Sequence, residues 1–235
     1  MQRRFFRVAA CAFVLTTLMG CLAPSLRTTE PKRVLIVADS VFHGSTVVSY
    51  PALEPVLGEE LAAAGIELRA LGTAGSRPAR DRWVQTVKQT VDEWNPDLVI
   101  FESAIPDDVE GKPRFGLVAT WALLYVAAAR HGADVWRVEP PTPVPGSFID
   151  AFHGPRLAQL RSAQADGARI GAENRPTTVE LGPVLASCDS PWTPDGGHLT
   201  VSGMWCVSDD LFRRIARREP RPRAPSDDST TTTAP

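Results

Sequence analysis

The 235-residue sequence lacks several features that would assign it to a common class of protein. It carries 25 Lys and Arg against 27 Asp and Glu, a net charge of −2, so there is no basic excess to bind a phosphate backbone and we expect no nucleic-acid partner. No G-x-x-x-x-G-K-[ST] loop occurs, and no G-x-G-x-x-G follows the first predicted strand, which argues against the common nucleotide sites. The four histidines are dispersed and no C-x-x-C pair occurs, so we expect neither a metal nor a cofactor.

The N-terminal segment has the pattern of an export signal. Residues 2–7 are basic, and residues 8–20 form an uncharged, mostly apolar run that is too short to span a bilayer with margin. The run ends in Leu-Met-Gly-Cys21, which resembles a bacterial lipobox and implies that Cys21 is lipidated and becomes the mature N-terminus. We predict a signal peptide over 1–20 and a lipid anchor on the extracytoplasmic face of the cell membrane. The alternative is a secreted protein whose signal is cleaved nearby.

Removal of the signal peptide changes what the composition means. It takes away three arginines and no acid, so the net charge falls from −2 to −5. Cys11 is lost with the signal, and besides the anchor only Cys188 and Cys206 remain. Because an exported chain meets an oxidising compartment, we predict that these two cysteines form a disulfide.

Both ends of the mature chain are poor in core-forming residues. Residues 21–32 hold two prolines and suit a tether between anchor and domain, whereas residues 218–235 combine prolines with a run of threonines and are typical of a disordered tail. The folded part is therefore predicted over residues 33–217, a length suited to one domain. We find no internal repeat and expect a monomer.

Within residues 33–217, apolar runs of strand length alternate with helical stretches. Residues 33–38 form a continuous run rich in β-branched residues, which is typical of a strand buried on both faces. The predicted strands are 33–38, 66–71, 97–102, 134–138 and 178–181, and the predicted helices are 53–64, 81–94, 115–130, 149–170 and 201–217. This alternation predicts an α/β domain with a parallel sheet covered on both faces, whose ligands bind outside the carboxyl ends of the strands.

Chemistry-bearing residues follow these predicted strand ends. Ser40 comes directly after the first strand, where a serine can act as a nucleophile, although a serine that caps a turn or a helix is the alternative. Asp195 precedes His198 by three residues in a loop that contains two glycines. A carboxylate at this spacing can hold the imidazole in the tautomer that accepts a proton from a serine. The loop from residue 182 to 200 also lies between the two cysteines of the predicted disulfide for most of its length.

The order of these motifs resembles the SGNH (GDSL-like) hydrolases. The motifs are Val-Ala-Asp-Ser40, then Gly72 with Gly75, then Asp195-x-x-His198 before a final helix. The resemblance is strongest to extracytoplasmic actinobacterial members, including the domain linked to surface-glycan acyltransferases. It implies a single three-layer α/β/α domain with a flavodoxin-like parallel sheet, which hydrolyses or transfers acyl esters.

The resemblance also implies a role for each motif residue. Ser40 corresponds to the nucleophile, His198 to the base and Asp195 to its orienting acid. Gly72 or Gly75 corresponds to the oxyanion N–H donor that acts beside the N–H of Ser40. The expected substrates are acylated envelope glycans or small acyl esters.

The sequence departs from the family pattern in two places. Ala38 replaces the glycine of the usual Gly-Asp-Ser start. The third predicted strand ends at Glu102 and is followed by Ser103, and residues 101–107 contain no asparagine where the family normally has one. Loss of one oxyanion donor typically costs about 10²- to 10³-fold in rate. Three explanations are open: another donor such as Ser103 replaces the asparagine, the enzyme is slow, or the protein is an envelope binding or scaffold protein that has kept the hydrolase fold. Glu102 would disfavour an oxyanion unless it is paired or points away.

Overall fold

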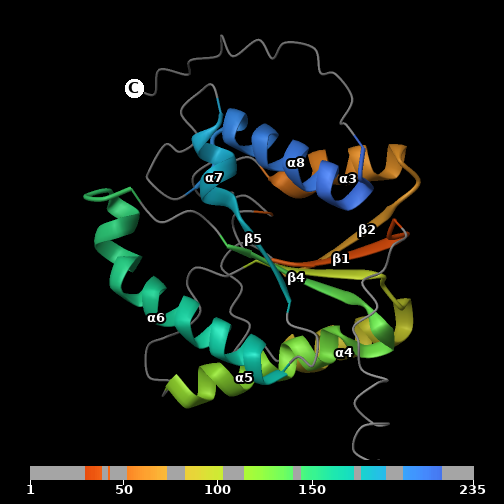
Figure 1. Cartoon of the computed structure of the whole chain (residues 1–235), viewed down its shortest axis with the longest axis horizontal. Helices are drawn as coiled ribbons and strands as arrows, with labels where there is room; N and C mark the ends of the chain where they lie inside the picture. Colours follow the sequence, from red (N-terminus) through yellow and green to blue (C-terminus); the bar gives the residue numbers. More distant parts are fainter. Residues whose placement is uncertain are drawn as a thin grey trace, which may run out of the picture.

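The computed structural model describes residues 30–38, 42, 52–72, 83–102, 114–139, 144–171, 176–188 and 198–218. Helices and strands alternate along these segments (Figure 1). In chain order they are β1 (Arg33–Val37), α3 (Leu53–Ala63), β2 (Glu67–Leu71), α4 (Trp83–Trp94), β3 (Leu98–Glu102), α5 (Arg114–Ala128), the 3₁₀ turn η1 (Arg130–Gly132), β4 (Asp134–Glu139), α6 (Phe148–Gly171), β5 (Thr177–Glu180), α7 (Leu181–Ala186) and α8 (Val201–Ala216). All five predicted strands are confirmed, and so are the five predicted helices, with boundaries that differ by a few residues at most.

The five strands form one parallel sheet. Their order is β2-β1-β3-β4-β5, which is the flavodoxin-like order of a doubly wound α/β domain. Every neighbouring pair is parallel, so all five carboxyl ends lie at the same edge. This confirms the predicted fold class.

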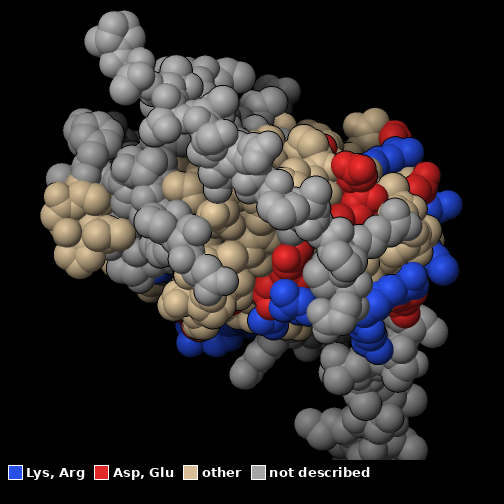
Figure 2. Space-filling view, turned by 90° about the horizontal axis from the view of Figure 1, so that it is seen from above, with Lys and Arg blue, Asp and Glu red and all other residues tan. Residues whose placement is uncertain are grey.

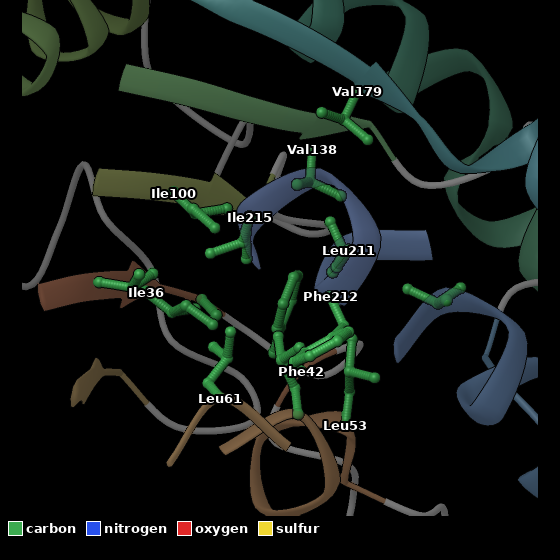
Figure 3. Close-up of a cluster of buried hydrophobic side chains, with 14 of the residues drawn as sticks. Ile36, Phe42, Leu53, Leu61, Ile100, Val138, Val179, Leu211, Phe212 and Ile215 are labelled. Atoms are coloured by element: carbon green, nitrogen blue, oxygen red, sulfur yellow. The ribbon is translucent and has the colours of Figure 1, made fainter. Parts of the chain in front are cut away.

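Helices cover both faces of the sheet, and β1 shows why its sequence is continuously apolar. Val34 and Ile36 belong to a core beneath α3, α7 and α8, whereas Leu35 and Val37 belong to a core beneath α4 and α5. Figure 1 shows α3 and α8 on one side of the sheet and α4, α5 and α6 on the other. Figure 3 shows the first of these cores, where side chains of the strands meet those of α3 and α8.

Positive φ angles mark the turns that lead into the strands. Gly65 (φ +80°) follows α3, and Asn95 (φ +49°) follows α4 in the predicted Asn-Pro turn. Both residue types adopt this left-handed conformation at low cost, so each helix ends and the chain enters the next strand within a few residues.

One prediction about local structure was wrong. The sequence predicts a loop from residue 182 to 200, but its first part is the helix α7, which starts at Leu181 directly after β5. The Gly-Pro pair at 182 and 183 suggests a turn, yet proline is tolerated in the first turn of a helix because its missing N–H would have no helical partner there. Leu181 and Leu185 anchor α7 in the core.

Charges of both signs lie beside each other on the described surface. Figure 2, which views the molecule from above, shows Lys and Arg side chains next to Asp and Glu side chains. Arg214 on α8 pairs with Asp210 at 2.6 Å, and Arg218 pairs with Glu30 at 2.7 Å. No described helix combines the length and the apolar character needed to cross a membrane.

Candidate active site

The carboxyl ends of β1, β2 and β3 meet at one edge of the sheet. Val37 is in register with Leu71 on β2 and with Phe101 on β3. The N–H of Ala38 donates to the Leu71 carbonyl at 3.0 Å, so the pairing continues to the last residue before the Asp-Ser40 pair. The next residues of β2 and β3 therefore flank the strand end that leads to Ser40.

Gly72 packs against this strand end more closely than any other residue type would. Its φ angle is +104°, and a Cβ placed on it would lie 2.2 Å from the carbonyl oxygen of Ala38 and 2.9 Å from the indole ring of Trp83. Residues with a side chain rarely adopt this φ, and no heavy atom fits at these distances. A glycine is thus required for the chain after β2 to pass directly beside the end of β1.

Phe42 anchors the chain just beyond Ser40. Its side chain is fully buried in the core beneath α3 and α8, next to Leu53 and Phe212 in Figure 3. Its backbone N–H donates a hydrogen bond to the carboxylate of Glu102, at 3.3 Å from Oε2. Glu102 is itself only 3% exposed. The last side chain of β3 is therefore tied to the backbone two residues after Ser40.

His198 lies where the chain enters α8. The N-cap of this helix is Thr200, whose Oγ1 accepts a hydrogen bond from the Gly203 N–H at 3.1 Å. Between them, Leu199 is buried in the same core as Phe42. The cap and the buried leucine fix the backbone on the C-terminal side of His198, and the imidazole itself is partly exposed.

A disulfide closes the loop that carries His198. Cys188 lies just after α7 and Cys206 lies on α8, their Cα atoms are 6.3 Å apart, and the two residues are bonded. The predicted pairing is confirmed. The closed loop contains both Asp195 and His198, so the disulfide restricts the chain that connects the proposed acid and base to α8.

The described residues contain part of the predicted site. The structure describes Gly72, His198, Cys188 and Cys206. The residues Ser40, Asp195, Gly75, Ser103 and Cys21 lie outside the described residues, and their roles stay predictions. No cluster of His, Cys, Asp and Glu among the described residues is arranged to bind a metal ion.

Two features of this edge were missed in the sequence. Phe42 could have been found from the sequence, because it is a large apolar residue two positions after Ser40. For Arg137 in β4 the sequence offers only a charged residue within an apolar run. The Arg137 side chain is 11% exposed, and its Nη2 lies 2.5 Å from Glu139 Oε1 and donates to Thr178 Oγ1 at 3.3 Å. Arg137 shares the sheet face of Phe101, the face opposite Glu102, so it forms a separate polar cluster.

Burial also affects the groups near Arg137. Burial lowers the pKa of the Arg161 guanidinium on α6, which also interacts electrostatically with Glu139 and Arg137. Tyr125 on α5 is fully buried, and its burial raises the pKa of its hydroxyl. Tyr125 therefore stays protonated across the physiological range and acts as a neutral group packed on Phe101, with ring centroids 5.3 Å apart.

Solved structures with a similar fold include GDSL-like lipases and a protein described as an SGNH hydrolase. A GDSL-like lipase from Bacteroides thetaiotaomicron superposes with a TM-score of 0.52 at 16% identity, over 86% of this chain and 95% of that one. A family 3 carbohydrate esterase from Clostridium thermocellum gives 0.52 at 14% identity, over 79% and 96%. A psychrotrophic esterase from Pseudoalteromonas, inhibited by monoethylphosphonate, gives 0.55 at 14% identity, over 79% and 97%.

These likenesses define the fold. The chain has the α/β fold of the SGNH hydrolases, which the order of its motifs predicted. No protein-family model and no curated protein sequence matches the chain. Identities of 14% to 16% support a shared fold, and any chemistry depends on this chain's own residues.

Proposed function

We propose that this protein is an extracytoplasmic ester hydrolase or O-acyl transferase that works through a Ser40 acyl-enzyme. The observation that carries the proposal is the close contact between Ala38 and Gly72 at the carboxyl edge of an SGNH-type sheet. It brings the segment after β2 against the strand end that continues into Ser40. Nucleophile and oxyanion donors require this proximity, because backbone N–H groups must face the oxygen of the ester that the serine attacks.

The proposed reaction uses two half-reactions at the same residues. In the first, Ser40 Oγ attacks the ester carbonyl and His198 accepts the hydroxyl proton. The oxyanion of the tetrahedral intermediate accepts hydrogen bonds from the N–H of Ser40 and from that of Gly72 or Gly75, with Ser103 as the replacement for the family's asparagine. The intermediate then collapses, the alcohol leaves with the proton from His198, and Ser40 carries the acyl group.

The second half-reaction frees the enzyme. His198 accepts a proton from water, or from the hydroxyl of an acceptor, and the resulting oxygen attacks the acyl-enzyme. Collapse of the second intermediate returns the proton from His198 to Ser40 Oγ. Water yields a carboxylic acid and an acceptor yields a new ester, so hydrolysis and transfer differ only in the second nucleophile. Asp195 orients the imidazole in both steps.

The proposed substrates are acyl esters on envelope glycans or small acyl esters. Two observations support this choice: one structural neighbour is a carbohydrate esterase, and the signal pattern with Cys21 would anchor this chain at the extracytoplasmic face of the membrane. The confirmed disulfide suits an oxidising compartment. We propose a monomer that needs no cofactor and no nucleic-acid partner.

A second function has its own observation. Residues 101–107, at the end of β3 and directly after it, contain no asparagine, and Glu102 is a buried carboxylate at that strand end. Both features would also suit an envelope binding or scaffold protein that keeps the hydrolase fold without turnover. The two functions differ in whether Ser40 is activated.

Turnover of a short acyl ester separates the two functions. We expect Ser40→Ala and His198→Ala each to lower kcat by about 10⁴-fold or more, because Ser40 carries the acyl group and His198 acts in every proton transfer. His131→Ala is the matched control: its imidazole lies 3.0 Å from Asp92 between α4 and η1, away from the carboxyl edge, and its loss should leave kcat unchanged. Equal rates in Ser40→Ala and wild-type protein would rule out the acyl-enzyme.

A further inference from the structure

We propose that Glu102 is a positioning residue, which holds the chain segment that begins at Ser40 by accepting the N–H of Phe42. The hydrogen-bond geometry is a property of the described residues, and its catalytic consequence rests on the proposed function. No step of the acyl transfer uses Glu102 directly.

The burial of Glu102 demands a compensating interaction. β3 is buried along its whole length, and Glu102 at its end is 3% exposed, less than any other described acidic residue that ends a strand. A carboxylate taken out of water is strongly destabilising unless it accepts hydrogen bonds. The N–H of Phe42 supplies one of them at 3.3 Å. Charge-assisted bonds of this kind are stronger than neutral ones, so the contact restrains both partners.

The direction of the Glu102 side chain connects two parts of the site. Glu102 is in register with Val138, and it therefore projects to the face covered by α3 and α8, where the Phe42 side chain is buried. Phe42 is thus held twice, through its ring in the core and through its N–H by Glu102. Ser40 lies two residues before Phe42 in the sequence, so the proposed restraint acts on the segment that begins at Ser40.

The same bond resolves the difficulty that an acidic residue poses near an oxyanion. An uncompensated negative charge at the end of β3 would oppose the negative charge of a tetrahedral intermediate. A carboxylate that accepts a backbone N–H is paired, and part of its charge is offset by that dipole. Glu102 can therefore occupy this position and order the nucleophile's segment.

Three substitutions at Glu102 test the role. Glu102→Gln keeps an acceptor at the same reach, Glu102→Met keeps the approximate volume without an acceptor, and Glu102→Asp keeps the charge but shortens the reach. Because a misplacement of about 1 Å can cost about 10²-fold, we expect kcat to fall by about that factor in Glu102→Met and less in Glu102→Asp, with KM nearly unchanged. Glu102→Gln should stay within about tenfold of wild type. Rates are expressed per active site, titrated with a fluorophosphonate.

A matched control separates positioning from stability. Ser208 on α8 is fully buried beneath the same face of the sheet, and its Oγ donates to Glu60 Oε2 at 3.1 Å, away from the strand ends. Ser208→Ala should lower the melting temperature and leave kcat per titrated site unchanged. A purely structural Glu102 would behave in the same way. Amide hydrogen exchange at Phe42 gives an independent reading: it should accelerate in Glu102→Met and stay slow in Glu102→Gln.

Each outcome decides one question. If wild type turns over ester and is labelled, but Glu102→Met has wild-type kcat per titrated site, the positioning role is overturned while the proposed function stands. An equal loss in Glu102→Gln and Glu102→Met also overturns it, since the amide retains an acceptor. If Glu102→Met does not fold, the other two variants are compared instead. A kcat near wild type in Glu102→Gln with a reduced kcat in Glu102→Asp supports the role, and wild-type kcat in both overturns it. A wild type that is neither labelled nor active overturns the proposed function and the catalytic role of Glu102 with it.

Discussion

The carbonyl oxygen of Ala38 lies so close to Gly72 that a Cβ on the glycine would be 2.2 Å from it. This contact joins two segments that follow neighbouring strands, one leading into Ser40 and the other into Gly75. Two of the three motifs on which the family resemblance rests therefore meet through backbone packing. The third motif is connected to them through Leu199, the residue after His198, because Leu199 is buried in the same hydrophobic core as Ala38.

The contact predicts that Gly72→Ala is severely destabilising. The Cβ clashes with backbone as well as with the Trp83 ring, and φ is +104°, so we expect a loss of about 3 kcal/mol in the free energy of unfolding. Gly65→Ala is the control, because Gly65 also has a positive φ (+80°) but no atom within 4 Å of its Cβ position. It should cost only about 1 kcal/mol. Urea unfolding measures both, and equal losses would mean that the Ala38 contact adds nothing.

The burial of Phe42 beside Ser40 in the chain leads to a second prediction, which compares two core variants. Phe42→Ala and Phe212→Ala each remove a buried ring from the core beneath α3 and α8, and each should lower the unfolding free energy by about 3 to 5 kcal/mol. Only Phe42 lies beside Ser40 in the chain. We therefore expect Phe42→Ala to slow fluorophosphonate labelling of the folded protein and Phe212→Ala to leave the labelling rate unchanged. Similar labelling rates in the two variants would show that the Phe42 ring does not order the serine.

The disulfide predicts a redox-dependent stability. Cys188 and Cys206 are separated by 18 positions, and closing a loop of this size stabilises the folded state by about 3 kcal/mol in the chain-entropy model. A reductant should lower the unfolding midpoint of wild type by the corresponding amount. The double variant Cys188→Ser/Cys206→Ser should start at the lower value and not respond to reductant. A wild-type protein whose unfolding midpoint does not change when the disulfide is reduced would contradict this contribution.

Much of the fold could be predicted because the relevant signals are local. Residues 34–38 are all apolar, as expected for a strand buried on both faces, and β1 indeed contributes Val34 and Ile36 to one core and Leu35 to the other. The same local reasoning failed for α7, where a Gly-Pro pair suggests a loop although Leu181 and Leu185 bury one side of a short helix. Tertiary burial decided the conformation there.

The arrangement of the candidate site could be predicted only in part. The disulfide was predicted by counting the cysteines that would remain after removal of the predicted signal peptide, and Gly72 was predicted from the family pattern. The bond between Glu102 and the Phe42 N–H joins residues 60 positions apart, and no spacing or periodicity encodes it. The sequence indicated that Glu102 must either be paired or point away from an oxyanion, and the register of β1 and β3 determines which backbone group is near enough to pair with it.

Covalent labelling of the full-length protein with a fluorophosphonate, followed by peptide mass spectrometry, tests the central claim most directly. An activated serine is phosphonylated, whereas an ordinary surface serine is not. The proposed acyl-enzyme predicts a single modified residue, Ser40, with labelling abolished in Ser40→Ala and strongly slowed in His198→Ala. A folded wild-type protein that stays unmodified at Ser40 would contradict the catalytic account and favour an envelope binding protein with a hydrolase fold.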